Sequence, residues 1–373
     1  MRPEALAVMV PAMADLYGNP SGSHALARAA RDELERAREG LASVTGCEPG
    51  DVVFTSGGTE ADNLAVRGAH GVRGGRVVCS ASDHHAVLHP VQQLGGQEVA
   101  VDARGIVDLD ALVGALDPSV ALVSVALVNN EIGTIQPIDA IAELVRIHAP
   151  DALLHVDAAQ ALCWLDLGEH AAQADLITLA SHKCGGPRGI GALIVRAGAS
   201  LTAQQIGGGQ ERERRSGTQD VASAVAFASA AEAAHQEREA LIARTSVWHE
   251  QLVRVVLDAI PGSIESAAPT GERGHLVAGI VNICLPHLDS EALLFLLEHE
   301  HSVLASAASS CASGAQEPSH VLASLGIDRA LARGSLRVSM GWSTVEADID
   351  AAAGAIPSAA ARLQTHAQDG APA

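Results

Sequence analysis

Several side chains that can do chemistry stand where short apolar segments of this sequence end. Ser56-Gly57-Gly58-Thr59 follows the apolar run 52–54 and precedes a stretch with helical spacing. At such a strand-to-helix turn, free backbone N–H groups and the helix dipole favour a phosphate. A Gly-Gly turn before a helix is by itself more often merely structural. The turn therefore becomes informative only with other groups beside it.

An acid and a lysine follow two later apolar runs. Asp157 and Gln160 come after one run, and Ser181-His182-Lys183 closes the run 176–180. Alone, Asp157 is as well explained as a helix cap and Lys183 as a solvent-facing side chain. A lysine held in a partly dry pocket, however, has a lowered pKa and can form a Schiff base.

The conjunction of these groups predicts one cofactor. Ligands of parallel α/β sheets bind outside the carboxyl ends of the strands, so the turn, the acid and the lysine are expected to meet. Pyridoxal phosphate (PLP) needs an anchor for its phosphate, a partner for its pyridinium nitrogen and an amine that forms an imine. We therefore predict a PLP site in which Lys183 carries the cofactor.

One of the six cysteines stands in a context that suits a reactive thiol. Cys311 lies among the small residues 306–315, which show no apolar period. That composition suits a loop that swings a thiolate into and out of a pocket, although an inert loop cysteine fits it equally well. The other five lie in apolar runs, beside glycines or outside any motif (Cys47, Cys79, Cys163, Cys184 and Cys284). No C-x-x-C spacing occurs, so no zinc or thioredoxin-like motif is predicted.

Composition and charge exclude several classes of protein. The 373 residues suggest two domains, and 48% hydrophobic with 18% charged residues is typical of a globular protein. The net charge of −20 repels phosphate backbones and anionic lipid, so we expect no direct nucleic-acid or membrane binding. We find neither a basic-then-apolar leader nor an apolar run of about 18 residues, and we expect a cytoplasmic protein with reduced thiols.

The apolar pattern alternates between strands and helices up to about residue 220. After a helix over 23–43, we expect strands at 52–54, 76–79, 120–128, 153–156, 176–179 and 192–195, with helices that begin near 59, 86 and 138. This alternation predicts a doubly wound, mostly parallel α/β sheet. Two consecutive helices (221–243 and 247–257) then lead to a smaller α+β unit with strands 280–285 and 336–340 and helices 290–299 and 345–363.

Taken in order, the motifs resemble those of the NifS/IscS-like cysteine desulfurases of aminotransferase class V. The resemblance covers about residues 17–344 and rests on these segments: Phe54–Asn63, Val128–Gly133, His155–Gln160, Ser181–Lys183, Arg215–Thr218, and Cys311-Ala312-Ser313 before Glu317-Pro318-Ser319. It implies the type I PLP fold and a homodimer with shared active sites. It also implies conversion of L-cysteine to L-alanine, with a persulfide on Cys311 that passes to an acceptor protein such as an iron–sulfur scaffold or a thiolation enzyme.

The resemblance also implies a role for each matching residue. Lys183 would form the Schiff base, and Asp157 would pair with the pyridinium nitrogen. The phosphate would be held by Gly58, Thr59, Ser181, His182 and, from the other subunit, Thr218. His84 would stack on the ring, Gln160 would bond its phenolic oxygen, and Asn130 would lie beside ring and substrate. Arg337, helped by Asn19, would grip the substrate carboxylate as a bidentate fork.

The implied domains are an N-terminal part of the small domain (1–18), a large PLP-binding domain (19–245), a small domain with the cysteine loop (246–364) and a frayed tail (365–373). Family members usually begin with a strand and an Ala-Thr-Thr-Pro-like segment, whereas this sequence starts at Met1-Arg2-Pro3. Trp342 replaces a second arginine that some members carry. Alternatives are a selenocysteine lyase or another class-V enzyme, or, because of the short N-terminus, a PLP-binding subunit with weakened activity. His85 and His89 lack a third ligand, so no metal is predicted.

Overall fold

The computed structural model describes residues 1–307 and 319–369, and they fall into two compact units. Unit 1 comprises Met1–Val99, Asp108–Val128 and Gln136–Arg238, and unit 2 comprises Ala100–Val107, Asn129–Ile135 and the chain from Glu239 onward. None of the helices in the described ranges is long and apolar enough to cross a membrane.

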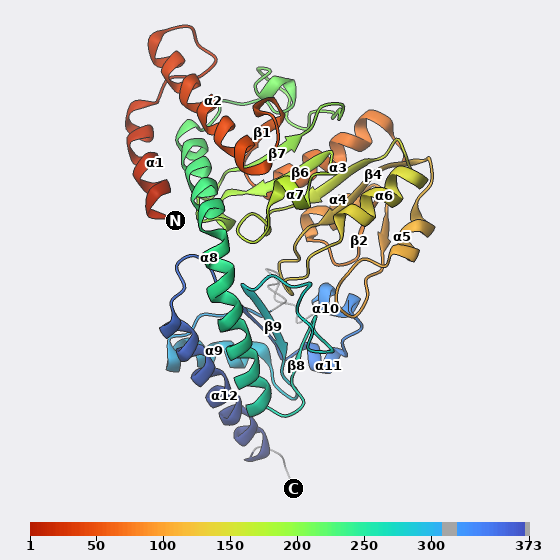
Figure 1. The fold of residues 1–373 in the computed structure, drawn as a ribbon, viewed down its shortest axis with the longest axis vertical. Helices are drawn as coiled ribbons and strands as arrows, with labels where there is room; N and C mark the ends of the chain where they lie inside the picture. The colour runs from red at the N-terminus through yellow and green to blue at the C-terminus, as the bar shows by residue number, and fades with distance from the viewer. Residues whose placement is uncertain (308–318, 370–373) are drawn as a thin grey trace. The chain divides into compact units, whose positions relative to one another are not determined.

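Unit 1 is built on a seven-stranded sheet in the order β1-β7-β6-β5-β4-β2-β3 (Figure 1). β7 runs antiparallel to both of its neighbours, β1 and β6, and every other pair of neighbours in this sheet is parallel, which confirms the prediction of a mostly parallel sheet. The apolar runs form strands because a strand covered on both faces can bury every side chain. The strands are β1 (Val52–Thr55), β2 (Arg76–Ser80), β3 (Gln97–Val99), β4 (Val120–Ala126), β5 (Leu153–Asp157), β6 (Leu176–Ala180) and β7 (Gly191–Val195).

Helices α3 and α4 cover one face of this sheet. Leu64 and Val66 of α3 and Val87 of α4 pack with Leu122 of β4 and Leu193 of β7 in one apolar core. The helices of unit 1 before α8 are α1 (Pro3–Asp15), α2 (Ala25–Thr45), α3 (Gly58–Arg73), α4 (His85–Gln93), α5 (Leu109–Ala115), α6 (Ile138–His148) and α7 (Leu167–His170). Three short 3₁₀ turns are η1 (Pro49–Asp51), η2 (Ser181–Lys183) and η3 (Glu211–Glu213).

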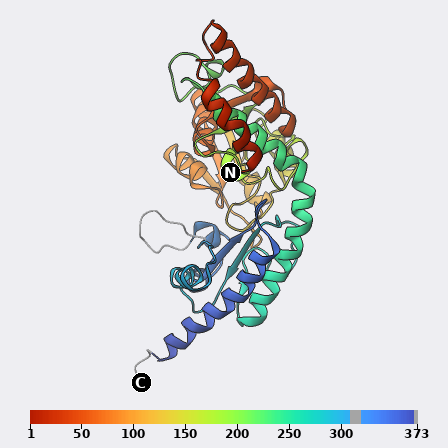
Figure 2. The same cartoon turned by 90° about the vertical axis from the view of Figure 1, so that its left-hand side faces the viewer.

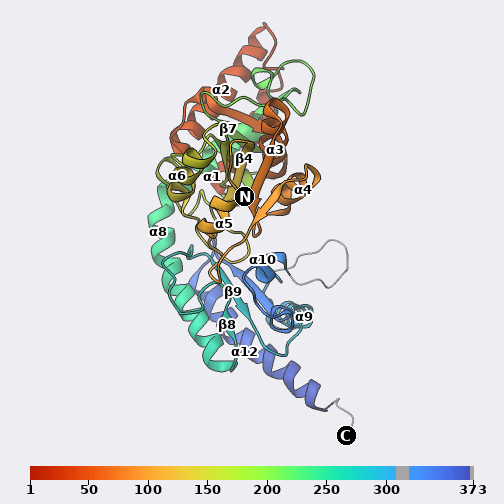
Figure 3. The ribbon, with the colours of Figure 1, turned by 90° about the vertical axis from the view of Figure 1, so that its right-hand side faces the viewer.

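Unit 2 contains an antiparallel sheet in the order β10-β9-β8, against which α9 and α12 pack (Figure 3). Leu252 of α8, Val281, Leu293, Leu336 and Ile356 belong to its apolar core. The elements are β8 (Ile264–Glu265), β9 (Ile280–Cys284), α9 (Ser290–His301), α10 (His320–Ser324), α11 (Arg329–Ala332), β10 (Ser335–Ser339) and α12 (Glu346–Asp369).

One sequence-based expectation about helices is wrong. The two helices expected over 221–257 form one unbroken helix, α8 (Val221–Ala259; Figure 2). The polar residues between them do not break it, because the hydroxyls of Thr245 and Ser246 bond helix carbonyls four residues earlier, at 2.7 and 2.8 Å. At the C-terminus, helix α12 runs through Asp369, beyond the end of the helix expected over 345–363.

The N-terminal residues belong to unit 1, whereas the implied domains assigned residues 1–18 to the small domain. Arg2 explains the difference. Its side chain is almost fully buried, and its Nε donates to the carbonyl oxygen of Cys184 at 2.9 Å. Its guanidinium also pairs with Glu237 at 2.7 Å. Helix α1, which the sequence analysis missed, therefore begins from a point fixed to the large sheet.

Candidate active site

The predicted cofactor residues of unit 1 lie at the carboxyl ends of adjacent parallel strands. Asp157 is the last residue of β5, and Lys183 ends the 3₁₀ turn η2 that follows β6 directly. Asp157 is paired in register with Thr178 of β6. The sheet thus brings the acid and the lysine to one edge, and the positive charge of Lys183 acts on the Asp157 carboxyl.

The turn predicted to hold a phosphate lies against the same strand ends. A Cβ built on Gly58, the first residue of α3, would stand 3.5 Å from the Cβ of Ala180 and 3.8 Å from that of Ala159. Gly57 has a φ of 152°, which side chains disfavour, and a Cβ on Gly191 would approach the Gly57 carbonyl carbon to 2.7 Å. The first backbone N–H groups of α3 therefore open directly beside the ends of β5 and β6.

The Ser181 side chain, directly after β6, carries a buried hydroxyl. Its Oγ is fully buried and has no hydrogen-bond partner. A buried hydroxyl without a partner costs free energy, and such groups usually belong to sites that bind a ligand or water. This hydroxyl lies beside Gly186, where a built Cβ would come within 2.1 Å of it, so the fit to a phosphate rests on the Gly57-Gly58 turn and not on Ser181. The residues present thus fit the phosphate of the predicted cofactor.

Three buried carboxyl groups lie in contact or in electrostatic range around the end of β5. Burial raises the pKa of Asp157, while a hydrogen bond from the Ala159 N–H and the charge of Lys183 lower it in part. Burial and the Asp157 charge raise the pKa of Asp62 well above its usual value. Burial also raises the pKa of Asp83 to about 8, although backbone N–H groups donate to it. Desolvation is the largest cause for each of the three carboxyls because all three are buried away from water.

His155 lies within this acidic region and is held neutral. Burial lowers its pKa to about 3. Its Nδ1 lies 2.8 Å from the Ser124 hydroxyl, and its Nε2 lies 3.0 Å from the Thr178 hydroxyl. A neutral ring bonded on both sides fixes the spacing of β4, β5 and β6 beneath Asp157. The sequence analysis did not assign a role to His155, Asp62 or Asp83, because nothing in their spacing distinguishes them from ordinary strand and helix residues.

His84 and Thr59 line one pocket of about 300 Å³ in unit 1. His84 caps helix α4, where its Nδ1 accepts a hydrogen bond from Ala86 N–H at 3.1 Å. The rings of His85 and His89 lie with their centroids 4.8 Å apart. Within residues 1–307 and 319–369, no group of three or more His, Cys, Asp or Glu side chains is arranged to hold a metal ion.

The remaining predicted residues of unit 1 are solvent-accessible to different degrees. Gln160 is half-buried, whereas Lys183, His182, Thr218 and Asn19 are exposed in the single chain. Burial, and then the charges of Lys183 and Arg188, lower the pKa of His182, so this ring favours its neutral form. The backbone N–H of Ser21 bonds the Asn19 side chain at 3.0 Å.

Thr218 follows a strained loop that is hydrogen-bonded to helix α2 and strand β1. Glu211, Arg212 and Glu213 all have positive φ, at 48°, 56° and 65°. The buried Glu211 carboxylate accepts from Arg38 at 2.9 and 3.0 Å and from Phe54 N–H at 2.8 Å. Three successive left-handed residues cost free energy and persist only where such contacts hold them. The loop that ends at Thr218 is thus fixed to α2 and β1, which the sequence pattern did not reveal.

Unit 2 brings together two other predicted residues. The Arg337 guanidinium of β10 donates from NH1 to the carbonyl oxygen of Asn130 at 3.0 Å. The Nε of Arg337 is buried without a hydrogen-bond partner, which leaves a donor for a carboxylate. Cys311 lies outside the described residues.

The five described cysteines are poor nucleophiles. Burial raises the pKa of Cys163 to about 11 and raises the pKa of Cys79, Cys184 and Cys284. Burial also raises the pKa of the half-buried Cys47. Because the thiolate is the reactive form, none of these five is suited to attack sulfur at neutral pH.

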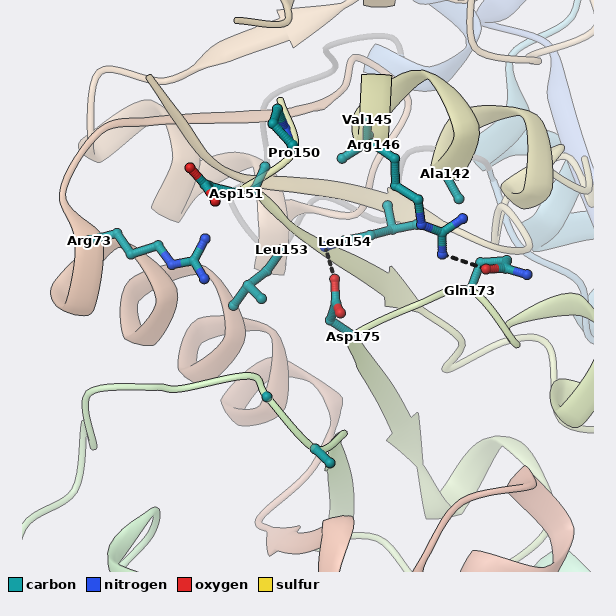
Figure 4. Close-up of a pocket in the computed structure, with 13 residues that line it drawn as sticks. Arg73, Ala142, Val145, Arg146, Pro150, Asp151, Leu153, Leu154, Gln173 and Asp175 are labelled. Atoms are coloured by element: carbon teal, nitrogen blue, oxygen red, sulfur yellow. Dashed lines mark hydrogen bonds between the residues drawn. The ribbon is translucent and has the colours of Figure 1, made fainter. Parts of the chain in front are cut away.

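A further pocket of about 280 Å³ lies in unit 1 beside Arg73, Arg146 and Asp151 (Figure 4). Its lining includes Leu153, the first residue of β5, and Gly198, which follows β7. It therefore lies at the amino ends of the parallel strands, opposite the edge that carries Asp157. Ligands of such sheets bind at the carboxyl ends, so this pocket is not the predicted cofactor site.

Comparison with known proteins agrees with this geometry. Residues 1–352 match the model of the aminotransferase class-V family. An IscS-like cysteine desulfurase of Mycobacterium tuberculosis is 40% identical, over 98% of this chain and 94% of that protein. A solved NifS-like protein superposes with a TM-score of 0.89 at 28% identity, over 97% of this chain and 96% of that one. The solved protein SspA in complex with cysteine gives a TM-score of 0.78 at 28% identity, over 92% of this chain and 97% of that one.

Proposed function

The chain belongs to the aminotransferase class-V family and, within it, to the NifS/IscS-like cysteine desulfurases, and from this premise we propose how its own residues carry out the reaction. Class-V members use PLP, and the fold is that of the type I PLP enzymes. The observation that carries the proposal is the meeting of Asp157, Lys183 and the Gly57-Gly58 turn at one sheet edge.

The residues at this edge would hold PLP by its two ends. The phosphate would be bound by the first N–H groups of α3 at Gly58 and by Thr59, Ser181 and His182. Asp157 would face the pyridinium nitrogen, which would stabilise the ionised form of a buried carboxyl whose pKa is otherwise raised. His84 would cover the ring face and Gln160 would bond the phenolic oxygen. When bound, PLP supplies an electron sink for the charge that develops at the substrate Cα.

Lys183 has two tasks in this proposal. Its amine would link the cofactor to the protein, and after the substrate amine replaces it, the same amine would move the proton at the substrate Cα. Its position directly after β6 suits both, because the 3₁₀ turn η2 is held by a bond of 3.1 Å from the Cys184 N–H to the Ser181 carbonyl oxygen. A base fixed in this way spends little free energy on orientation.

The substrate proposed for this chain is L-cysteine, which is also the molecule named in complex with the structural relative SspA. Arg337, with Asn130 beside it and with help from Asn19, would bind the substrate carboxylate. The guanidinium is preorganised because one of its nitrogens already bonds the Asn130 carbonyl oxygen. Its buried Nε would then donate to a carboxylate oxygen.

Cys311 is proposed as the sulfur acceptor. Its thiolate would attack the substrate sulfur, so that an S–S bond forms while the Cβ–S bond breaks. The electron pair of the broken bond passes to the substrate carbon skeleton, which takes up a proton and leaves as L-alanine. The product on the protein is a Cys311 persulfide. The raised pKa values of the other five cysteines support this assignment.

We further propose a homodimer in which Thr218 reaches the phosphate of the partner subunit. The exposure of Thr218 at the end of an anchored loop supports this arrangement. The persulfide would pass to an acceptor protein of iron–sulfur assembly or thiolation, and the enzyme would work in the cytoplasm.

The proposal is tested with purified, PLP-loaded protein and L-cysteine. We expect L-alanine, and we expect Cys311→Ala to reduce its formation about a hundredfold or more while the cofactor absorbance stays. Cys47→Ala, which changes another thiol that is not fully buried, should keep full activity. If Cys311→Ala turned over L-cysteine at the wild-type rate, or if Lys183→Ala kept the cofactor spectrum of the wild type, the roles assigned here would be wrong.

A further inference from the structure

The turn that begins at Asn129 is held by side chains of two strands of unit 2. Asn282 of β9 donates from Nδ2 to the main-chain carbonyl of Glu131 at 3.2 Å. Arg337 of β10 donates to the main-chain carbonyl of Asn130 at 3.0 Å. Inside the turn, Asn129 Oδ1 accepts from the Glu131 N–H at 2.9 Å. The backbone on both sides of Asn130 is therefore fixed.

The Glu131 side chain leads from this turn to another part of unit 2. Glu131 is only 8% exposed, and its Oε2 accepts a hydrogen bond from the Ser319 hydroxyl. Burial raises the pKa of Glu131 to about 7, which the Ser319 hydrogen bond and the Arg337 charge oppose. A buried carboxyl is costly unless it is bonded, so the pair with Ser319 is more than an incidental surface contact.

Described residues on either side of segment 308–318, which contains Cys311, are bonded to Arg337 and Glu131. On the N-terminal side, Ser306 and Arg337 exchange backbone hydrogen bonds of 3.1 and 2.7 Å. On the C-terminal side, Ser319 bonds Glu131 and also caps α10, where its Oγ accepts from Val321 N–H at 3.1 Å. Arg337, which bonds Asn130, thus also bonds Ser306, and Glu131, the residue after Asn130, bonds Ser319.

We propose that Glu131 is a positioning residue for sulfur transfer, because its bond fixes Ser319, the residue that follows segment 308–318 with Cys311, relative to Asn130 and Arg337. This inference rests on the roles proposed above for Cys311 and Arg337. Glu131 makes and breaks no bond in the reaction and acts through Ser319. Orientation of a nucleophile contributes strongly to rate, so loosening one end of its segment slows the transfer step more than substrate binding.

The test compares Glu131→Ala and Ser319→Ala with their conservative partners Glu131→Gln and Ser319→Thr. The first two should form L-alanine about tenfold more slowly, with KM and the absorbance change on mixing with L-cysteine close to wild type. Gln keeps an acceptor and Thr keeps the hydroxyl, so both should retain most of the rate. The double variant should be no slower than either single Ala variant, because both changes remove one contact.

Asp328→Ala is the matched control, since Asp328 caps α11 as Ser319 caps α10 but contacts neither Glu131 nor Ser319. Wild-type alanine formation in Glu131→Ala, or an equal loss in Asp328→Ala, would overturn the proposal. The rate of Cys311 alkylation, measured by mass spectrometry, distinguishes failure of the positioning proposal from failure of the proposed function. If the wild type forms no alanine, the proposed desulfurase function is wrong. The proposed role of the Glu131–Ser319 contact then stands only if Glu131→Ala and Ser319→Ala each change the alkylation rate of Cys311 at least about threefold. Asp328→Ala must leave that rate unchanged.

Discussion

Burial shifts the pKa of individual carboxyl groups in this protein. Asp157 and Glu131 are both carboxyls whose pKa is raised, and desolvation is the largest cause in each. They differ in what faces them. Asp157 meets Lys183 and is proposed to face a cation, whereas Glu131 meets a neutral hydroxyl from Ser319. The first arrangement suits a cofactor site, and the second suits an internal anchor.

The raised pKa of Glu131 predicts a pH-dependent stability. The carboxyl binds its proton more tightly in the folded chain than in the unfolded chain, so its contribution is fully present below about pH 4.5 and is lost as pH rises through about 7. We expect the wild type to lose about 2–3 kcal/mol relative to Glu131→Gln between pH 4.5 and 8. Urea unfolding of both proteins at several pH values measures this difference. Parallel pH profiles for the two proteins would contradict the raised pKa.

At the scale of elements, short irregular segments carry more of the site than the helices do. The turn η2 holds Lys183, and the left-handed turn η3 leads to Thr218. The second turn exists because Glu211 is bonded to Arg38 in a buried pair. The buried Glu211 therefore holds the strained backbone of η3, and together they fix the loop that leads to Thr218.

Removing that buried carboxylate should be strongly destabilising. Glu211→Ala leaves the Arg38 guanidinium buried and without its main partner, and we expect a loss of about 3–5 kcal/mol in the free energy of unfolding. By contrast, Glu213→Gly, at an exposed position with φ of 65°, should stabilise by about 0.5–1 kcal/mol because glycine accepts that conformation. Chemical denaturation measures both. Equal losses for the two variants would show that strain in η3 is not held by Glu211.

At the scale of the whole chain, contacts between distant positions join the N-terminus to the lysine turn. Arg2 bonds the carbonyl oxygen of Cys184, the residue after Lys183, and pairs with Glu237 of α8. It is a buried arginine in a chain of net charge −20. Its position makes the first residues part of unit 1.

Arg2→Ala should therefore act on the cofactor turn as well as on stability. We expect a loss of about 1–3 kcal/mol from the unsatisfied Cys184 carbonyl and the broken pair, together with weaker retention of PLP. Thermal unfolding and dialysis followed by absorbance measure the two effects. Arg28→Ala, in which an exposed arginine is changed, is the control. Unchanged PLP retention in Arg2→Ala would limit its role to stability.

The sequence by itself determined the family, the α/β class and nearly all strands of the large sheet. Apolar runs such as 120–126 can be buried only inside a covered sheet, and motifs such as Ser181-His182-Lys183 are local, so both are readable without coordinates. The roles assigned to individual residues, and Cys311 above all, stay predictions. Where spacing alone left Asp157 open between helix cap and ligand, its place beside Lys183 came from strand pairing.

Only the tertiary structure decided which distant residues meet. Asp62, Asp83 and His155 gather around Asp157 because α3 packs on the sheet and β4 stands between β2 and β5. Asp83, in the loop after β2, accepts from the Ala126 N–H at the end of β4. Glu131 meets Ser319 across 188 positions of sequence, and Arg38 meets Glu211 across 173. No local pattern marks such pairs, because burial and partner choice are set by how elements pack. That packing turns ordinary carboxyls into groups with raised or lowered pKa values.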